Sequence, residues 1–172
     1  MDTIKIILDA VGIFTAALSI IFFFVAVISW FLGISPLLYR LGFGRWSRKI
    51  DIIADDANFN SLKIDLVDTG VFRAKNIRHI SKAGLAKVKE MDLGLLHYQS
   101  FTPTQIETIL GNKKAGAGLV TYFPEFSPPS NVIPNDMMKK INDHSFTTIV
   151  NFRGRLVNDL LVTLLSTSYE KK

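Results

Sequence analysis

Polar and charged residues that could bind a ligand together follow three short apolar segments of this chain. They are Asp55 and Asp56, then Ser100, and finally Arg153, Gly154 and Arg155. In an open parallel sheet the carboxyl ends of the strands share one edge, and ligands bind at that edge. The sequence therefore predicts a ligand- or anion-binding site at the ends of these three segments.

The two arginines of this set stand at the start of a helical pattern, where a cation is unfavourable unless something negative meets it. Free backbone N–H groups at such a helix start also favour an anion. The partner of Arg153 and Arg155 could be a nucleotide phosphate, a lipid headgroup, a partner subunit, or Asp55 or Asp56 of the same chain. The sequence leaves these alternatives open.

The chain lacks the motifs of several other kinds of binding or catalytic site. The segment ADDANF (54–59) contains neither a G-x-G-x-x-G nor a Walker pattern, and the chain has no cysteine. His79, His97 and His144 form no i, i+4 pair, so we predict neither a cofactor nor a metal ion. An acidic pair such as Asp55-Asp56 more often begins a helix as its cap, although with Glu125 or Ser100 it could hold a divalent metal.

The elements that must position these residues alternate regularly between apolar strand patterns and helical patterns. The predicted strands are Lys49–Asp55, Asn76–Ser81, Asp92–Gln99, Ala117–Glu125 and Ser145–Phe152. The predicted helices are Asn58–Gly70, Gly84–Met91, Pro103–Asn112, Asn135–His144 and Arg153–Glu170. Five such units predict an α/β domain with a five-stranded parallel, doubly wound sheet of order 2-1-3-4-5, flavodoxin-like in architecture. The loop Pro124–Asn135 is long enough to be a lid or a contact surface.

The first forty residues predict a single transmembrane helix. No charged residue occurs from Ala10 to Tyr39, and the stretch Ala10–Gly33 is long enough to cross the hydrocarbon layer as a helix. A cleaved signal peptide would have a positive start and a shorter apolar run, so we expect a retained anchor. The predicted organisation is a transmembrane helix (1–34), an interfacial linker (35–48) and a cytoplasmic domain (49–172).

The orientation follows from basic residues that flank the span. Arg40, Arg45, Arg48 and Lys49 follow it, whereas Lys5 stands alone before it. Basic residues stay inside, which places the N-terminus outside and the domain in the cytoplasm, on the inner (cytoplasmic) membrane. The same cluster could rest on anionic lipid, our first predicted partner. In the linker, Leu37, Leu38, Leu41 and Phe43 could dip into the headgroup layer, or the segment could be a plain linker.

Small residues in the span indicate that it could self-associate. Gly12 with Ala16, and Ser29 with Gly33, have the spacing that lets two membrane helices approach closely. We therefore expect a homo-oligomer. The formal net charge is +5, but no basic run is interleaved with aromatic residues, so we expect no nucleic-acid partner.

In element order, residues 48–172 resemble the small flavodoxin-fold signalling domains, including receiver domains and TIR-like domains. Asp55 and Asp56 match the paired acids of a receiver. The chain departs from the receiver pattern elsewhere, because Tyr98-Gln99-Ser100 replaces the phospho-accepting aspartate and the lysine of strand five is absent. The resemblance to TIR-type NAD hydrolases implies a catalytic glutamate near Glu107, whereas the residues alone indicate a solvent-facing position. A membrane helix before such a domain also resembles membrane effectors of bacterial anti-phage signalling.

Two hypotheses follow for the function. The first is a non-enzymatic membrane signalling or effector protein, whose domain binds a nucleotide signal, another ligand or a protein partner and controls self-association of the span. The second is a membrane-tethered TIR-like NAD or nucleotide hydrolase that uses Glu107. A third, weaker hypothesis is a structural subunit that docks through the loop Pro124–Asn135 and the last helix.

Overall fold

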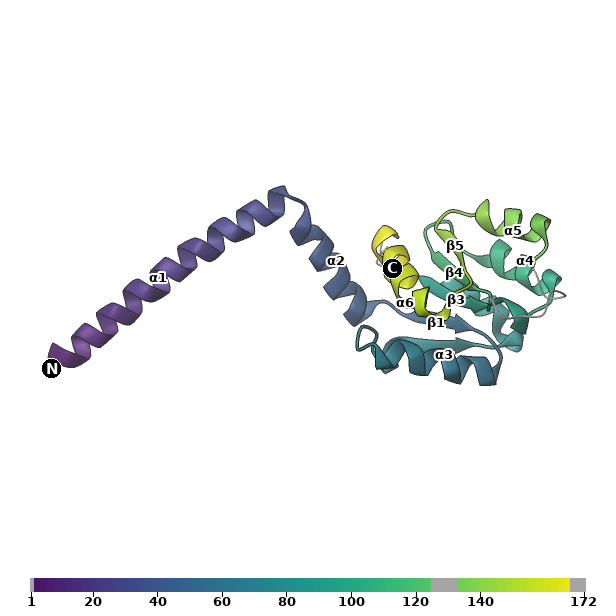
Figure 1. Cartoon of the computed structure of the whole chain (residues 1–172), viewed down its shortest axis with the longest axis horizontal. Helices are drawn as coiled ribbons and strands as arrows, with labels where there is room; N and C mark the ends of the chain where they lie inside the picture. Colours follow the sequence, from purple (N-terminus) through teal and green to yellow (C-terminus); the bar gives the residue numbers. More distant parts are fainter. Residues whose placement is uncertain (1, 125–132, 168–172) are drawn as a thin grey trace. The chain divides into compact units, whose positions relative to one another are not determined.

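A computed structural model describes residues 2–124 and 133–167 of the chain, with the backbone alone for Asp2, Arg40 and residues 43–46. The chain divides into two compact units, Met1–Arg40 and Leu41–Lys172. Figure 1 labels their helices and strands. Most of the loop predicted at Pro124–Asn135, including Glu125, lies outside the described residues.

The first unit is built on helix α1 (Asp2–Phe31). Its segment Thr3–Phe31 is long and apolar enough to cross a membrane, and it is the single such helix among the described residues. The charge-free part from Ala10 onward is about 33 Å long at 1.5 Å per residue, which matches a hydrocarbon layer of about 30 Å. Within it, Thr15 and Ser19 donate their hydroxyl hydrogens to backbone oxygens one turn earlier, at 2.8 and 2.9 Å. These polar groups therefore need no water.

Gly33 ends the first helix. Its φ of 71° is left-handed, a conformation that glycine adopts without a steric penalty, and its N–H donates to the carbonyl of Trp30 at 3.0 Å. Helix α2 (Ile34–Ser47) begins at the next residue. The predicted linker is therefore helical, and Gly33 lies at a turn rather than on a continuous helix with Ser29.

The second unit contains the predicted sheet. Its strands are β1 (Ile50–Ile53), β2 (Ile77–Ile80), β3 (Leu93–His97), β4 (Gly118–Tyr122) and β5 (Thr147–Val150). All neighbouring strands are parallel, and the order is β2-β1-β3-β4-β5. This confirms the predicted fold class and strand order. The order reverses between β1 and β3, so the switch point lies where those two strands end.

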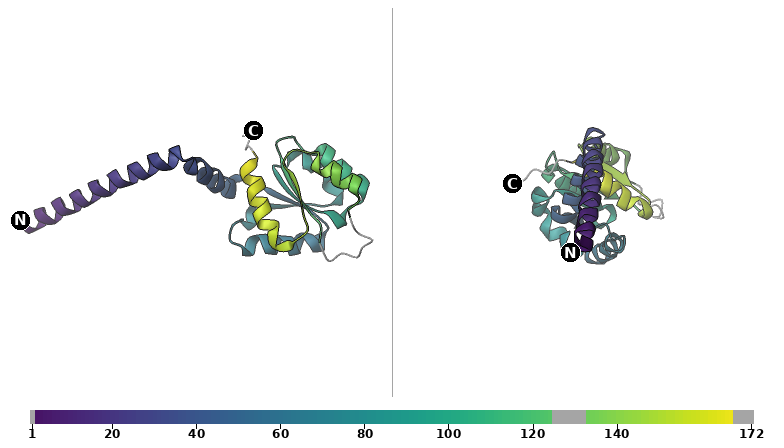
Figure 2. Two further views of the ribbon diagram at one scale, coloured as in Figure 1. Left: turned by 45° about the horizontal axis from the view of Figure 1, so that its top comes forward. Right: turned by 90° about the vertical axis from the view of Figure 1, so that its left-hand side faces the viewer.

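Helices cover both faces of the sheet (Figure 2). Helices α3 (Asp56–Asp68) and α6 (Leu156–Ser166) pack on one face. Helices α4 (Pro103–Asn112) and α5 (Asn135–Asn142) pack on the other. Strand residues alternate between the two cores: Ile50 and Ile52 face α3 and α6, whereas Ile53 faces the opposite core. Leu156, Leu160 and Leu164 form the buried apolar stripe of α6.

The helix expected at Gly84–Met91 is a 3₁₀ helix instead, η2 (Lys82–Glu90). Leu85, Val88 and Met91 are spaced by three residues, and all three pack into the core that α4 and α5 cover. A 3₁₀ helix has three residues per turn and so places all three on one face. The apolar spacing of three, rather than three and four, explains the difference.

A buried ion pair joins β1 to the edge strand β2. Asp51 has no exposed surface and accepts two hydrogen bonds from the guanidinium of Arg78, at 2.6 and 2.7 Å. The two residues are also directly paired in the strand register. Burial raises the pKa of Asp51, while the bonds from Arg78 oppose the rise. The pair therefore favours this register of β2, because a shift would leave a buried carboxylate unpaired.

Arg48 does not face the membrane surface as predicted. It is buried, and its Nη1 donates to the carbonyl oxygens of Leu164 and Thr167 at 2.8 and 3.2 Å. These carbonyls lie at the C-terminal end of α6, where a helix leaves oxygens without partners and favours a cation. Arg48 thus joins the segment between α2 and β1 to the end of α6, while its neighbour Lys49 is exposed.

Candidate functional site

Asp55 stands at the switch point, directly after β1, and begins α3. It is the N-cap residue: its Oδ1 accepts from the backbone N–H of Asn58 at 2.9 Å. The side-chain amide of Asn58 donates to both carboxylate oxygens, at 3.1 and 2.8 Å. These bonds to the charged form, led by the backbone N–H of Asn58 and joined by the hydroxyl of Ser100, lower the pKa of Asp55 to about 2. Asp55 is therefore a carboxylate at physiological pH.

Ser100 connects Asp55 to a buried histidine. It lies in the short 3₁₀ turn Tyr98–Ser100 that follows β3, and its hydroxyl donates to Oδ2 of Asp55 at 2.7 Å. The same hydroxyl oxygen is 2.9 Å from Nδ1 of His97, the last residue of β3. The sequence prediction placed Asp55 and Ser100 in one site, and the structure brings their side chains into direct contact. It also adds His97.

The geometry assigns the tautomer of His97. A serine hydroxyl has one hydrogen, and here it is directed at the Asp55 carboxylate. The hydroxyl oxygen must therefore accept a hydrogen from Nδ1 of His97, which leaves Nε2 of the neutral ring as an acceptor. Burial lowers the pKa of His97, and the nearby charge of Arg153 lowers it further against the attraction of Asp55.

Arg153 lies close to this network but is directed at α3. It follows β5, and its Nε donates to Oδ2 of Asp65 at 2.5 Å. Its Nη2 donates to the hydroxyl of Ser61, also at 2.5 Å. The acidic partner of Arg153 is thus neither Asp55 nor Asp56, but Asp65 in the last turn of α3. This ion pair joins the end of β5 to α3 on the side of the sheet that α3 and α6 cover.

The remaining predicted site residues do not meet Asp55 and Ser100. Arg155 pairs with Asp159 one turn along the last helix, at 3.7 Å. Gly154 is exposed and lies in the 3₁₀ turn Arg153–Arg155. Asp56 is exposed and lies 3.6 Å from Nδ1 of His79. Both arginines therefore have acidic partners within this chain, Asp65 and Asp159, rather than the Asp55 or Asp56 considered from the sequence.

Glu107 lies in α4, on the outer surface of the domain. Its carboxylate accepts a hydrogen bond from Nζ of Lys140 in α5 at 2.5 Å, and both side chains are about half exposed. The bond and the negative charge of Glu107 raise the pKa of Lys140. This is the arrangement of a solvent-facing ion pair between two helices.

The helix N-termini at the switch point already have side-chain caps. Asp55 occupies the start of α3 with its own negative charge. At the start of α4, Thr102 and Gln105 form a capping box, in which each side chain bonds the backbone N–H of the other. A ligand phosphate would need these N–H groups. The site offers instead an ionised carboxylate and an imidazole acceptor, which suit a ligand that donates hydrogen bonds or carries positive charge.

Sequence reasoning missed His97, Tyr122, Asp65 and Ser61. Tyr122 ends β4, beside β3, and its ring packs edge-on to that of His97 with centroids 5.8 Å apart. A signal for His97 was present, because it is the last residue of a strand and stands three residues before Ser100. No comparable signal exists for Asp65, which is 88 residues from Arg153.

The described residues contain no group of three or more histidine, cysteine or acidic side chains that could hold a metal ion. No protein-family model matches the chain, and no curated protein or solved structure is significantly similar to it. The fold alone classifies this chain. What the structure supports is a flavodoxin-like order of strands and helices in general.

Proposed function

We propose that this chain is a membrane-anchored binding protein. Helix α1 would hold it in a membrane, and the α/β domain would bind a ligand or partner at the carboxyl edge of its sheet. Binding there would control self-association of the membrane helices. The observation that carries the proposal is the hydrogen-bonded chain Asp55–Ser100–His97, which joins the ends of β1 and β3.

The position of this network supports a binding role. Flavodoxin-like sheets bind their ligands where the strand order reverses, and the two strands that the network joins are the strands on either side of that reversal. Such a buried polar network also limits the orientation of its members. His97 is held with Nε2 as acceptor, so a ligand donor would meet a group that is already oriented.

The composition of α1 supports the anchor and self-association. Its side chains are exposed along almost the whole helix, and in water this would leave a large apolar surface uncovered. Gly12 and Ala16 lie one turn apart on one face, and the space around Gly12 is open. Two copies could therefore approach closely there.

Self-association is tested by mass photometry of the full chain extracted in mild detergent. We expect a discrete oligomer for the natural sequence. Replacing Gly12 and Ala16 with leucine should shift the population towards monomer, because the larger side chains would separate the helices. Replacing Ala10 and Ala17 with leucine is the matched control, since these residues lie on the opposite face of α1. A monomer under every condition, or equal loss in both double variants, would contradict the proposal.

Ligand binding is tested by thermal unfolding of the full chain with probes of known chemistry. We expect adenosine or spermidine, which supply hydrogen-bond donors, to raise the melting temperature of the natural protein. The same probes should have no effect on the variant Ser100→Ala with His97→Gln. Inorganic phosphate should have no effect on either protein. Stabilisation by phosphate alone would show that the site selects anions and that the assigned ligand chemistry is wrong.

A further inference from the structure

Helix α2 carries an apolar stripe that is exposed in its first half and packs against the domain at its last residue. Ile34, Leu37, Leu38 and Leu41 have the i, i+3, i+4, i+7 spacing of one helix face. The first three are exposed, at 45%, 49% and 60%. Leu41 instead packs against the core that α3 and α6 cover in the second unit. The sequence left open whether Leu41 dips into the headgroup layer or belongs to a plain linker, whereas in the structure it packs against the domain.

The position of α2 in the chain determines what can cover the exposed part of the stripe. Leu32 and Gly33 alone separate α2 from α1. The charge-free part of α1 spans about 33 Å, or one hydrocarbon layer, so a helix that starts at Ile34 must start at the membrane surface. The exposed part of the stripe is its first half, nearest that surface. Lipid is thus within reach of Ile34, Leu37 and Leu38 without any further partner.

We propose that the first half of α2 lies on the lipid surface, with Ile34, Leu37 and Leu38 inserted at the boundary between headgroups and acyl chains. The second half leaves the surface at Leu41 and joins the domain. The inference rests on the membrane anchor of the proposed function. It adds a second lipid contact, one that holds the domain close to the membrane instead of on a free tether.

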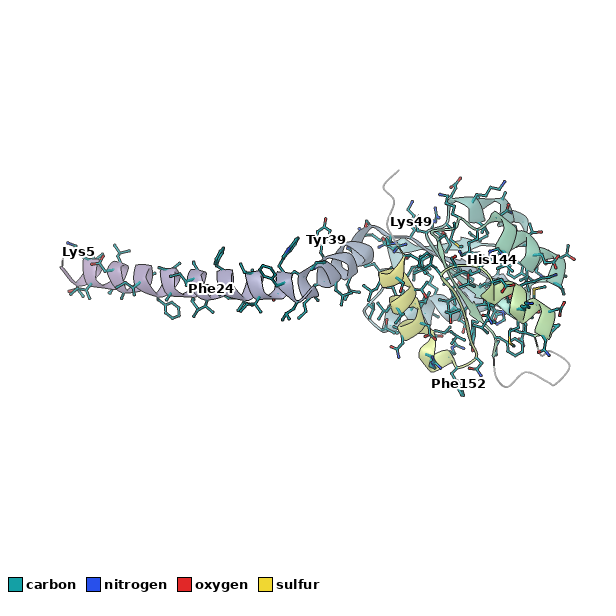
Figure 3. The ribbon with its side chains drawn as sticks, turned by 90° about the horizontal axis from the view of Figure 1, so that it is seen from above. Lys5, Phe24, Tyr39, Lys49, His144 and Phe152 are labelled. Atoms are coloured by element: carbon teal, nitrogen blue, oxygen red, sulfur yellow. The ribbon has the colours of Figure 1, made fainter. Side chains whose placement is uncertain are left out.

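A residue on the opposite face of α2 serves as the control in an experiment that measures the lipid contact of each position. Pro36 is exposed and lies on the side of the helix away from the stripe. Phe24 is in the middle of α1 and projects away from the helix (Figure 3). The chain has no cysteine, so a single introduced cysteine carries a spin label without background labelling.

The experiment uses the full chain in liposomes of neutral and anionic phospholipid, with a nitroxide label on Phe24→Cys, Pro36→Cys, Leu37→Cys or Leu38→Cys. Collision rates with oxygen, which concentrates in lipid, and with a water-soluble nickel chelate are measured by electron paramagnetic resonance. We expect the ratio of oxygen to nickel collisions to be severalfold higher at positions 37 and 38 than at position 36. Circular dichroism confirms that each labelled chain is folded.

The label at position 24 separates failure of this inference from failure of the anchor. If position 24 favours oxygen while positions 36, 37 and 38 all favour nickel, the anchor stands and the lipid contact of α2 is refuted. If position 24 favours nickel, the anchor itself is refuted. If positions 37 and 38 are immobile and meet neither reagent, protein covers the stripe, such as α2 of a second copy, and the lipid contact is again refuted.

Discussion

At the scale of single residues, Ser100 connects the two titratable groups of the candidate site, because its hydroxyl contacts both Asp55 and His97. Its hydroxyl hydrogen stabilises the charged form of Asp55, and its oxygen orients His97. Asp55 and His97 therefore titrate as neighbours, and acid should destabilise the domain in two ranges of pH. Protonation of either group destabilises the folded state, since each binds a proton less readily in the folded state than in the unfolded state.

The first prediction concerns the stability of the full chain between pH 7 and pH 2. His97 should reduce the free energy of unfolding as the pH falls below 6.5, and Asp55 should reduce it further as the pH falls from 3.8 towards about 2. Asp55→Asn retains a capping side chain and should remove the lower range alone. His97→Gln should remove the upper range alone. Urea unfolding followed by circular dichroism checks both, and identical pH profiles for the three proteins would contradict the assignment.

A second prediction at this scale separates the hydrolase hypothesis from the binding proposal. Glu107 pairs with Lys140 on the outer surface, and no other predicted site residue contacts it in the described part of the chain. We expect NAD cleavage by the full chain to be negligible, and equal in the natural protein and in Glu107→Ala. Turnover that falls on substitution of Glu107, but not of the exposed Thr104 in the same helix, would instead support a TIR-like enzyme.

At the scale of elements, the sequence predicted what depends on local pattern and missed what depends on distant contacts. All five strands and their order followed from the alternation of apolar strands with helices. Helix η2 is a 3₁₀ helix instead of the predicted α-helix, because its apolar residues recur every three positions. Arg48 and Arg153 could not be assigned, because their partners lie 116 and 88 residues away. An arginine that follows a membrane helix is usually expected to contact lipid. Only the packed domain shows that Arg48 is buried.

The contact of Arg48 with α6 gives a prediction for this element. Arg48→Met should lower the free energy of unfolding by about 2–4 kcal/mol, because buried carbonyl oxygens at the end of α6 would lose their donor. Lys49→Met is the control: its side chain is exposed, and we expect a change within about 0.5 kcal/mol. Urea unfolding of the full chain measures both. Equal, small changes would mean that the carbonyls of Leu164 and Thr167 do not depend on Arg48.

At the scale of the whole molecule, the anchor and the candidate site connect to opposite edges of the sheet. The chain enters the domain from α2 at the start of β1, whereas Asp55 and Ser100 follow the ends of β1 and β3. Figure 3 shows Lys49, before β1, and Phe152, after β5, at opposite ends of the domain. Helix α6 spans this distance: its first turn follows Arg153, and its last carbonyls bind Arg48. If the carboxyl ends of the strands bind a ligand as proposed, α6 is the element that connects them to the attachment point of α2.

The bond between Arg48 and α6 can form only when synthesis of the chain is almost complete. Arg48 leaves the ribosome soon after α1, whereas its partner carbonyls at Leu164 and Thr167 are made 116 and 119 residues later. The apolar α1 has thus left the ribosome long before the domain can complete its core. A nascent chain interrupted before α6 would have the α6 side of its sheet uncovered. The last helix therefore completes the core that it shares with α3.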